Sequence, residues 1–270
     1  MTPADPFPQR RPRVPVLVVV AAAIAVTVFA LPLVGLFART SWSTLIQDIT
    51  RPESLEALRL SMICSLGATA LSLLFGMPLA WILARVPFRG RSLVRGLVLL
   101  PLVLPPVVGG VALLSAFSRR GLVGQYLDEW FGLQLTFSTA GAILAETFVA
   151  LPFFVITVEA GLRAMDRRYE DAAVSLGASP VVVFRRVTLP LILPSVVAGT
   201  VLAWARALGE FGATITFAGN IVGRTQTLPL AVYLELESHP DTAVALSLVL
   251  LVVSLTVIVS LRDRWLGGVR

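Results

Sequence analysis

Long apolar stretches alternate with short polar segments along the chain. A membrane-spanning helix needs about 20 predominantly apolar residues, because each residue advances it by about 1.5 Å and the hydrocarbon layer is about 30 Å thick. Six stretches meet this length, namely Val14–Ala38, Leu60–Ala84, Gly96–Ser118, Thr139–Ala160, Leu191–Phe217 and Thr242–Leu261. The pattern therefore predicts an all-α, polytopic membrane protein with six transmembrane helices.

The prolines and the connecting segments add detail to this pattern. Pro101, Pro105 and Pro106 should kink the third span, because proline lacks the backbone N–H that a helix interior uses. In the loop after that span, the aromatic residues of Tyr126–Leu135 suit a position at the membrane surface. Residues 219–240, between the fifth and sixth spans, are predicted to form a loop.

The composition agrees with a membrane protein. Hydrophobic residues make up 56% of the chain and charged residues only 14%, and the mean hydropathy is +0.86, which leaves too little polar surface for a soluble globule. The net charge of +6 comes from 22 arginines without a single lysine. These arginines flank the spans and do not form the basic stripe that nucleic acid would need. We therefore predict contact with membrane lipid and none with nucleic acid.

The distribution of the arginines predicts the orientation in the membrane. With six spans, both termini lie on one side, and that side carries 15 arginines against 6 on the other, with Arg206 inside a span. Cytoplasmic segments carry the excess of positive charge. We predict a cytoplasmic N-terminal tail over residues 1–13, a transmembrane domain over residues 14–262 and a cytoplasmic C-terminal tail over residues 263–270.

Few side chains could carry out chemistry. The chain has one histidine, His239, and one cysteine, Cys64, and it lacks the H-E-x-x-H, G-x-S-x-G and phosphate-loop motifs. His239 precedes a proline and has no partner at ligand spacing, so we expect a solvent-facing or capping side chain rather than a metal ligand. We predict no catalytic residue, no metal and no cofactor bound by this chain, and a membrane-embedded enzyme is disfavoured.

The polar segment of residues 163–190 is the longest in the second half of the chain. Asp166 can cap a short helix by accepting free N–H groups of its first turn, and Gly177 can end this helix in the left-handed conformation. Ser179 and Pro180 then provide a cap and a first-turn proline for a second helix. Each helix is shorter than the roughly 12 to 15 residues that marginal stability in water requires, so we expect a partner surface to hold the pair.

The same segment resembles the permease subunits of ATP-binding cassette (ABC) importers at their EAA motif. The residues that match its spacing are Asp171, Ala172, Ala173, Gly177, Val187, Leu189 and Pro190. Asp171 replaces the glutamate of the motif and Val187 replaces its isoleucine. The resemblance implies a coupling helix in which these residues, together with Glu170, contact a separate ATPase subunit that binds ATP and Mg²⁺. An amphipathic loop on the membrane surface is the alternative.

Two further stretches narrow the resemblance. Leu100–Gly124 and Ala205–Tyr233 are similar to the permeases of molybdate importers, with sulfate, thiosulfate and tungstate as alternative substrates. The resemblance implies a type I importer in a bacterial cytoplasmic membrane. Two copies of the chain would form the pore, an ATPase dimer would drive it, and a periplasmic or lipid-anchored protein would deliver the oxyanion. A membrane assembly protein without transport activity is a further alternative.

The fifth predicted span carries ionisable residues. Arg206 and Glu210 lie four residues apart on one helix face, and such groups inside a membrane face a partner or a water-filled cavity. They can neutralise each other, or Arg206 can attract an anion while Glu210 orients it or helps to seal the gate. Thr214 and Thr216 fit the same path, although threonines in spans also serve helix packing. These four residues are our candidates for the translocation path or gate.

Overall fold

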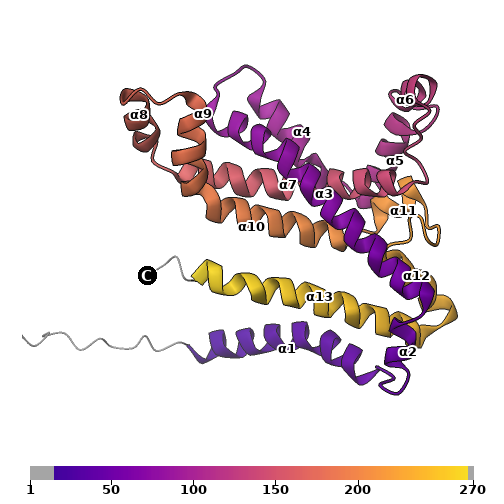
Figure 1. Cartoon of the computed structure of the whole chain (residues 1–270). Helices are drawn as coiled ribbons and strands as arrows, with labels where there is room; N and C mark the ends of the chain where they lie inside the picture. Colours follow the sequence, from indigo (N-terminus) through magenta and orange to yellow (C-terminus); the bar gives the residue numbers. More distant parts are fainter. Residues whose placement is uncertain (1–14, 267–270) are drawn as a thin grey trace, which may run out of the picture. The chain divides into compact units, whose positions relative to one another are not determined.

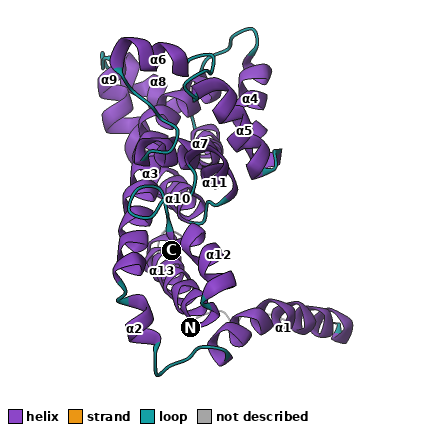
Figure 2. Cartoon of the chain, turned by 90° about the vertical axis from the view of Figure 1, so that its right-hand side faces the viewer, coloured by secondary structure: helices purple, strands orange, loops and turns teal. Residues whose placement is uncertain are grey.

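The computed structural model describes residues 15–266, with side chains through Val257, and every regular element in this range is helical (Figure 2). Five helices in the described range are long and apolar enough to cross a membrane. The all-α membrane architecture is therefore confirmed. The predicted N-terminal tail, residues 1–13, lies outside the described residues, as do residues 267–270 of the predicted C-terminal tail.

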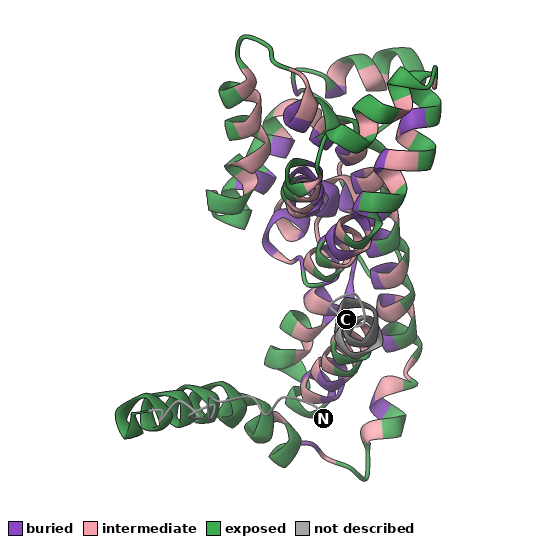
Figure 3. Cartoon of the chain, turned by 90° about the vertical axis from the view of Figure 1, so that its left-hand side faces the viewer, coloured by how far each residue is buried: buried purple, intermediate pink, exposed green. Residues whose placement is uncertain are grey.

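Helix α1, Val16–Ala38, belongs to a unit that ends at Ser41 and is described by itself. None of its residues is buried, and Figure 3 shows it exposed almost throughout. A helix that is apolar on all faces needs an apolar surrounding, which lipid provides. Its bounds confirm the first predicted span to within two residues.

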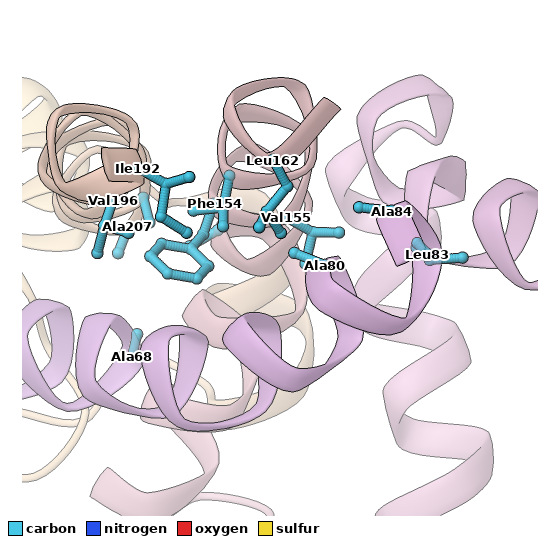
Figure 4. Close-up of a cluster of buried hydrophobic side chains, with 13 residues drawn as sticks. Ala68, Ala80, Leu83, Ala84, Phe154, Val155, Leu162, Ile192, Val196 and Ala207 are labelled. Carbon is cyan, nitrogen blue, oxygen red and sulfur yellow. The ribbon is translucent and has the colours of Figure 1, made fainter. Parts of the chain in front are cut away.

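Three long helices form the centre of the second unit, which begins at Trp42. They are α3 (Pro52–Arg85), α7 (Thr139–Ala164) and α10 (Leu189–Leu208), and α7 packs along both of the others (Figure 1). Phe154 of α7 points between α3 and α10 and is completely buried (Figure 4). The second and fourth predicted spans correspond to α3 and α7, each of which extends several residues beyond the predicted bounds.

Small residues let these helices approach closely. A Cβ atom at Gly76 of α3 would lie 2.6 Å from the ring of Phe154, and one at Gly161 of α7 would lie 2.2 Å from the hydroxyl of Ser195 on α10. Within lipid, helices associate through close packing because burial from water offers no advantage there. Glycine at these contacts is therefore part of what holds the centre together.

The third predicted span is not a single helix. It divides into α4, Arg91–Val103, and α5, Pro106–Phe117, which contain 13 and 12 residues. Leu104 between them is extended, with ψ of 135°, because the ring of Pro105 disfavours a helical residue before it. The predicted kink is thus a complete break, while Pro101 remains inside α4.

The fifth predicted span also ends earlier than expected. Helix α10 stops at Leu208, and a separate short helix, α11, covers Gly212–Ala218. The predicted loop over residues 219–240 contains another helix, α12, Leu228–Ser238, whose buried Leu228 and Ala231 pack against α3 and α13. The prediction of a loop over this whole stretch was wrong. Pro229 lies in the first turn of α12, a position that suits proline because the N–H groups there have no partner within the helix.

The remaining helices complete the unit. They are α2 (Leu45–Ile49), α6 (Gly124–Phe131), α8 (Arg168–Ser175), α9 (Pro180–Val183) and α13 (Pro240–Leu266). In Figure 1, α8 and α9 lie at one end of α7 and α10, whereas α11 and α12 lie at the other end. The two groups of candidate residues therefore occupy opposite ends of the central helices.

Candidate coupling and translocation sites

Local hydrogen bonds define where helix α8 begins and where it ends. The carboxylate of Asp166 accepts a hydrogen bond of 3.0 Å from the backbone N–H of Arg168, which satisfies one of the free donors of the first turn. At the other end, the N–H of Ala178 donates to the carbonyl of Ala173, and the N–H of Gly177 donates to that of Val174. This pattern is a Schellman motif, and Gly177 has the positive φ of 81° that the motif requires. Both predicted boundaries are confirmed.

The second predicted helix does not end before the fifth span. Helix α9 passes into a π-helical segment, Phe184–Thr188, and then into α10 without a break. Pro190 explains the π segment, because its ring and its missing N–H disrupt the hydrogen bonding of the preceding turn. The motif residues Leu189 and Pro190 are thus the first two residues of α10, directly after the π-helical segment.

Helix α8 presents an exposed face. Asp171 and Ala172 are exposed, Ala173 is partly buried, and Leu176 is 90% exposed. Exposed apolar side chains also occur on α8 and in the segment that follows it, namely Tyr169, Val174, Leu176, Val181 and Val182. Exposed apolar groups rimmed by polar ones mark a contact surface for another molecule.

Glu170, which the sequence places in the same group, faces inward. Its carboxylate is 3.2 Å from the guanidinium of Arg85, the last residue of α3, and it accepts a hydrogen bond of 2.6 Å from Thr188. Sequence reasoning missed both partners. In the sequence, Arg85 is one of many arginines beside a span. It is 85 residues away from Glu170, so no local sequence pattern indicates that the two side chains meet.

Arginines also bind the end of α3. The carbonyl of Leu83 accepts hydrogen bonds from Arg91 and Arg95, and that of Ala84 accepts one of 3.4 Å from Arg167. The last carbonyls of a helix lack partners within it and carry partial negative charge, so these arginines stabilise the end of α3. Arg95 also pairs with Glu159 of α7, which ties the ends of three helices together.

At the opposite end of α10, Arg206 and Glu210 form an ion pair with a distance of 2.6 Å between Nη2 and Oε2. The side chain of Arg206 is 27% exposed and that of Glu210 only 1%. The other oxygen of Glu210 accepts a hydrogen bond of 2.8 Å from the N–H of Ala213 and so caps α11. Glu210 lies beyond the end of α10, so the expectation of one continuous helix face was wrong, although the pairing itself is present.

The two threonines of α11 differ in their surroundings. The hydroxyl of Thr216 donates to the carbonyl of Gly212. Thr216 also packs against Gly110 of α5, and a Cβ atom added to Gly110 would lie 2.5 Å from Cβ of Thr216. Thr214 is fully buried, and its hydroxyl has no hydrogen-bond partner among the described residues. Thr216 therefore takes part in helix packing, whereas the hydroxyl of Thr214 is buried without a partner among the described residues.

Glu146 of α7 is a further buried polar residue of this region. It is 1% exposed, one of its carboxylate oxygens lacks a hydrogen-bond partner among the described residues, and Glu210 lies within electrostatic range of it. The sequence places Glu146 inside a span without indicating its neighbours. Across the described residues, no three His, Cys, Asp or Glu side chains are grouped closely enough to hold a metal ion.

Comparison with known protein families shows to which family the chain belongs. The family described as "Binding-protein-dependent transport system inner membrane component" matches residues 76–267. This chain belongs to that family. The match includes the whole of α7 and α10, and hence residues 163–190 and the region of Arg206 of this permease.

Two relatives show how similar individual members are. The permease is 52% identical over 243 residues to the Molybdenum transport system permease protein ModB of Mycobacterium bovis. This alignment covers 90% of this chain and 92% of the relative. It is 36% identical over 238 residues to the Sulfate transport system permease protein CysT of Salmonella typhimurium, with coverage of 87% and 86%.

A solved structure shares the fold of the permease. It is the crystal structure of a bacterial ABC transporter involved in the import of the acidic polysaccharide alginate, with a TM-score of 0.73 and 20% identity. The match covers 94% of this chain and 95% of the other. At this identity the likeness concerns the arrangement of the helices, which is that of an ABC transporter permease.

Proposed function

We propose that this permease carries molybdate into the cell as the membrane subunit of an ATP-driven importer. The identity of 52% to a molybdenum permease, against 36% to a sulfate permease over a similar length, is the observation that carries the proposal. Sulfate, thiosulfate and tungstate are the alternative substrates, since all are oxyanions of the same charge.

The exposed face of α8 is the docking surface for the ATPase. Asp171 and Ala172 are exposed there, Ala173 is partly exposed, and the same helix and the turn after it carry the exposed apolar side chains of Tyr169, Val174 and Leu176. Two copies of the permease form the pore, so two such faces meet an ATPase dimer that holds ATP and Mg²⁺. Closure of that dimer draws the faces together, and a change from 1:99 to 99:1 between two pore states requires about 5.5 kcal/mol of differential binding.

The pore region favours passage of an anion over tight binding. Arg206 offers a partly exposed positive charge, but Glu210 already neutralises it at 2.6 Å. An oxyanion delivered by a separate binding protein would compete with Glu210 for the guanidinium. Because the pair has no net charge, it attracts the anion only weakly, which suits a path that must also release it.

The orientation of the proposed importer places both termini and α8 in the cytoplasm. Leu176 beside α8 and Leu122 before α6 are 90% and 77% exposed, so cysteines at these sites should react readily. In a Cys64→Ala background, a maleimide that cannot cross membranes should label Leu122→Cys on intact cells. It should label Leu176→Cys only after permeabilisation. The opposite labelling pattern would reject the orientation.

Uptake by the reconstituted importer tests the substrate. The permease is placed in liposomes with its ATPase and binding protein, and entry of radioactive molybdate is measured with ATP on the ATPase side. A hydrolysis-deficient ATPase is the control, and unlabelled sulfate is the competitor. We expect ATP-dependent molybdate uptake that a tenfold excess of sulfate leaves largely intact. Preferred uptake of sulfate, or no uptake of any oxyanion, would refute the proposal.

A further inference from the structure

Two adjacent carboxylates of α8 have different surroundings. Asp171 is exposed on the proposed docking face, whereas the side chain of Glu170 is 17% exposed and contacts two other elements. One oxygen of Glu170 lies 3.2 Å from Arg85, and the other accepts the hydrogen bond from Thr188 at 2.6 Å. Both oxygens are thus engaged within the permease.

The two partners of Glu170 occupy the ends of the central helices. Arg85 is the last residue of α3, and its side chain is 9% exposed. Thr188 is buried at the end of the π segment, directly before Leu189 and Pro190 at the start of α10. Glu170 therefore touches one residue at the end of α3 and one at the beginning of α10.

Shielding from solvent makes the contact with Arg85 significant. Exposed ion pairs contribute little, because water and salt screen them and two flexible side chains must be ordered. Here both side chains are largely covered, and loss of one partner would leave the other buried without compensation. The two side chains lie at ion-pair distance, but their geometry is not that of a hydrogen bond, so the attraction is mainly electrostatic.

A second contact lies just before α8. Arg167 donates to the carbonyl of Ala84 in the last turn of α3. Both Arg167 and Glu170 therefore hold α8 against the same turn, whereas α8 continues into α9 only through the turn around Gly177. Side-chain contacts supply a connection to α3 that the chain itself does not provide.

We propose that Glu170 is a positioning residue that makes α8, the end of α3 and the start of α10 move as one body. This inference rests on the proposed function, because α8 moves only if an ATPase docks on it. Asp171 and the apolar face contact the ATPase, and Glu170 passes the displacement to the two pore helices. Loss of Glu170 should leave docking intact and uncouple hydrolysis from transport.

The first test compares transport with hydrolysis in the complete reconstituted complex. With Glu170→Ala, we expect the ATPase to copurify in normal amount and to hydrolyse ATP, while molybdate transported per ATP falls at least tenfold. Thr188→Val, which removes one of the two contacts, should have a smaller effect. Glu56→Gln is the matched control, because it removes an exposed ion pair with Arg59 elsewhere on α3 and should change nothing.

Charge reversal provides the second test. Arg85→Glu and Glu170→Arg should each uncouple the complex, and the double variant should restore at least half of the transport per ATP. A coupling ratio within twofold of wild type for Glu170→Ala would overturn the proposal. Loss of ATPase copurification would place Glu170 in the docking surface instead, and a double variant no better than the single ones would also contradict the link.

A structural measurement separates this inference from the proposed substrate. Hydrogen exchange in the peptide covering residues 166–178 should speed up at least fivefold in Glu170→Gln, a conservative variant, in complexes without substrate. If wild type transports no oxyanion but this change occurs, the proposed substrate fails while the mechanical link stands. If exchange is unchanged in Glu170→Gln and Thr188→Val, α8 does not depend on these contacts and the link is rejected.

Discussion

Arg206 Nη2 and Glu210 Oε2 lie 2.6 Å apart at the point where α10 ends and α11 begins. Glu210 has two roles there, because its second oxygen caps α11 through the N–H of Ala213. The pair therefore combines charge neutralisation with local backbone stabilisation, and substitutions can separate the two effects.

A double-mutant cycle should resolve these contributions. Arg206→Ala leaves a buried carboxylate without its cation and should cost about 3 kcal/mol of stability, the lower end of the range for buried pairs, because Arg206 is partly exposed. Glu210→Gln keeps a capping oxygen and should cost about 1 kcal/mol. Arg206→Ala with Glu210→Gln should be more stable than Arg206→Ala alone. Thermal unfolding in detergent micelles measures this.

The control for that cycle is Arg59→Ala, which removes an exposed ion pair and should cost less than about 0.5 kcal/mol. If the two substitutions at the pair were simply additive, their side chains would not interact energetically. Full stability and full transport in Arg206→Ala would exclude both a structural and a transport role for this arginine.

Gly177 should tolerate asparagine but not valine. Its φ of 81° is costly for a β-branched residue, by about 1–3 kcal/mol, whereas asparagine adopts this conformation more readily. A Cβ at this position would meet nothing within 4 Å, so the cost is conformational and not steric. Transport by Gly177→Val should fall while the protein still inserts into the membrane, as measured by uptake and by its amount in the membrane.

Gly96→Ala is the matched control for Gly177. It lies inside α4 with equally open space around its Cβ and without a positive φ. Alanine should be neutral or slightly stabilising there, because it favours helix more than glycine does. Equal transport by Gly177→Val and Gly177→Asn would show that the left-handed conformation is not needed.

Gly110→Ala should weaken the contact between α5 and α11. The added Cβ would lie 2.5 Å from Cβ of Thr216 and 3.0 Å from the carbonyl oxygen of Ala213, neither of which can rotate away. Overpacking of this kind costs about 1–3 kcal/mol, so the unfolding midpoint in detergent should drop. Thr216→Ser keeps the hydroxyl and removes a methyl group. Because that methyl would lie 3.0 Å from the added Cβ, this change should recover part of the loss in Gly110→Ala, and failure to do so would show that Cβ of Thr216 and the carbonyl of Ala213 carry the whole clash.

The structure around α6 should depend on pH through Asp128. Hydrogen bonds from Arg119 at 2.7 Å and from Gln134 at 3.1 Å lower the pKa of Asp128 below its usual value. The resulting stabilisation is present above the unfolded pKa of about 3.9 and is lost as the pH falls through the lower pKa of the folded state. Acidification below about pH 4 should therefore loosen α6.

Fluorescence of Trp130 can report this change, since its ring lies 5.4 Å from that of Tyr126 on α6. The other four tryptophans are replaced by phenylalanine. Asp128→Asn should abolish the acid step, and Glu129→Gln, at the neighbouring position, should preserve it. Persistence of the step in Asp128→Asn would assign it to another group.

The amino-acid sequence by itself determined where the long helices lie. Within lipid every backbone polar group must be satisfied inside its own segment, so long apolar stretches can only be helical. Local chemistry also set the boundaries of α8, since Asp166 caps its start and Gly177 supplies the positive φ at its end. Such signals involve neighbours within a few residues, which is why they can be read without a structure.

Other features depended on contacts between distant segments. The apolar stretch of the fifth span suggested one long helix. In the structure α10 ends at Leu208, and Glu210 caps the separate helix α11. Pro105 and Pro106 indicated a kink, but only the structure showed two separate helices, of which α4 packs on α7 and α5 packs mainly on α11.

The clearest case concerns Glu170 and Asp171. The two residues are adjacent on a short amphipathic helix, and the family motif directs attention to Asp171. Their orientations differ by about 100° around the helix axis, since a turn contains 3.6 residues. Which one is covered depends on where the last turn of α3 lies, and that position brings Arg85 to Glu170 while Asp171 stays in solvent. Tertiary packing alone decided this, because no local property of the helix distinguishes the two carboxylates.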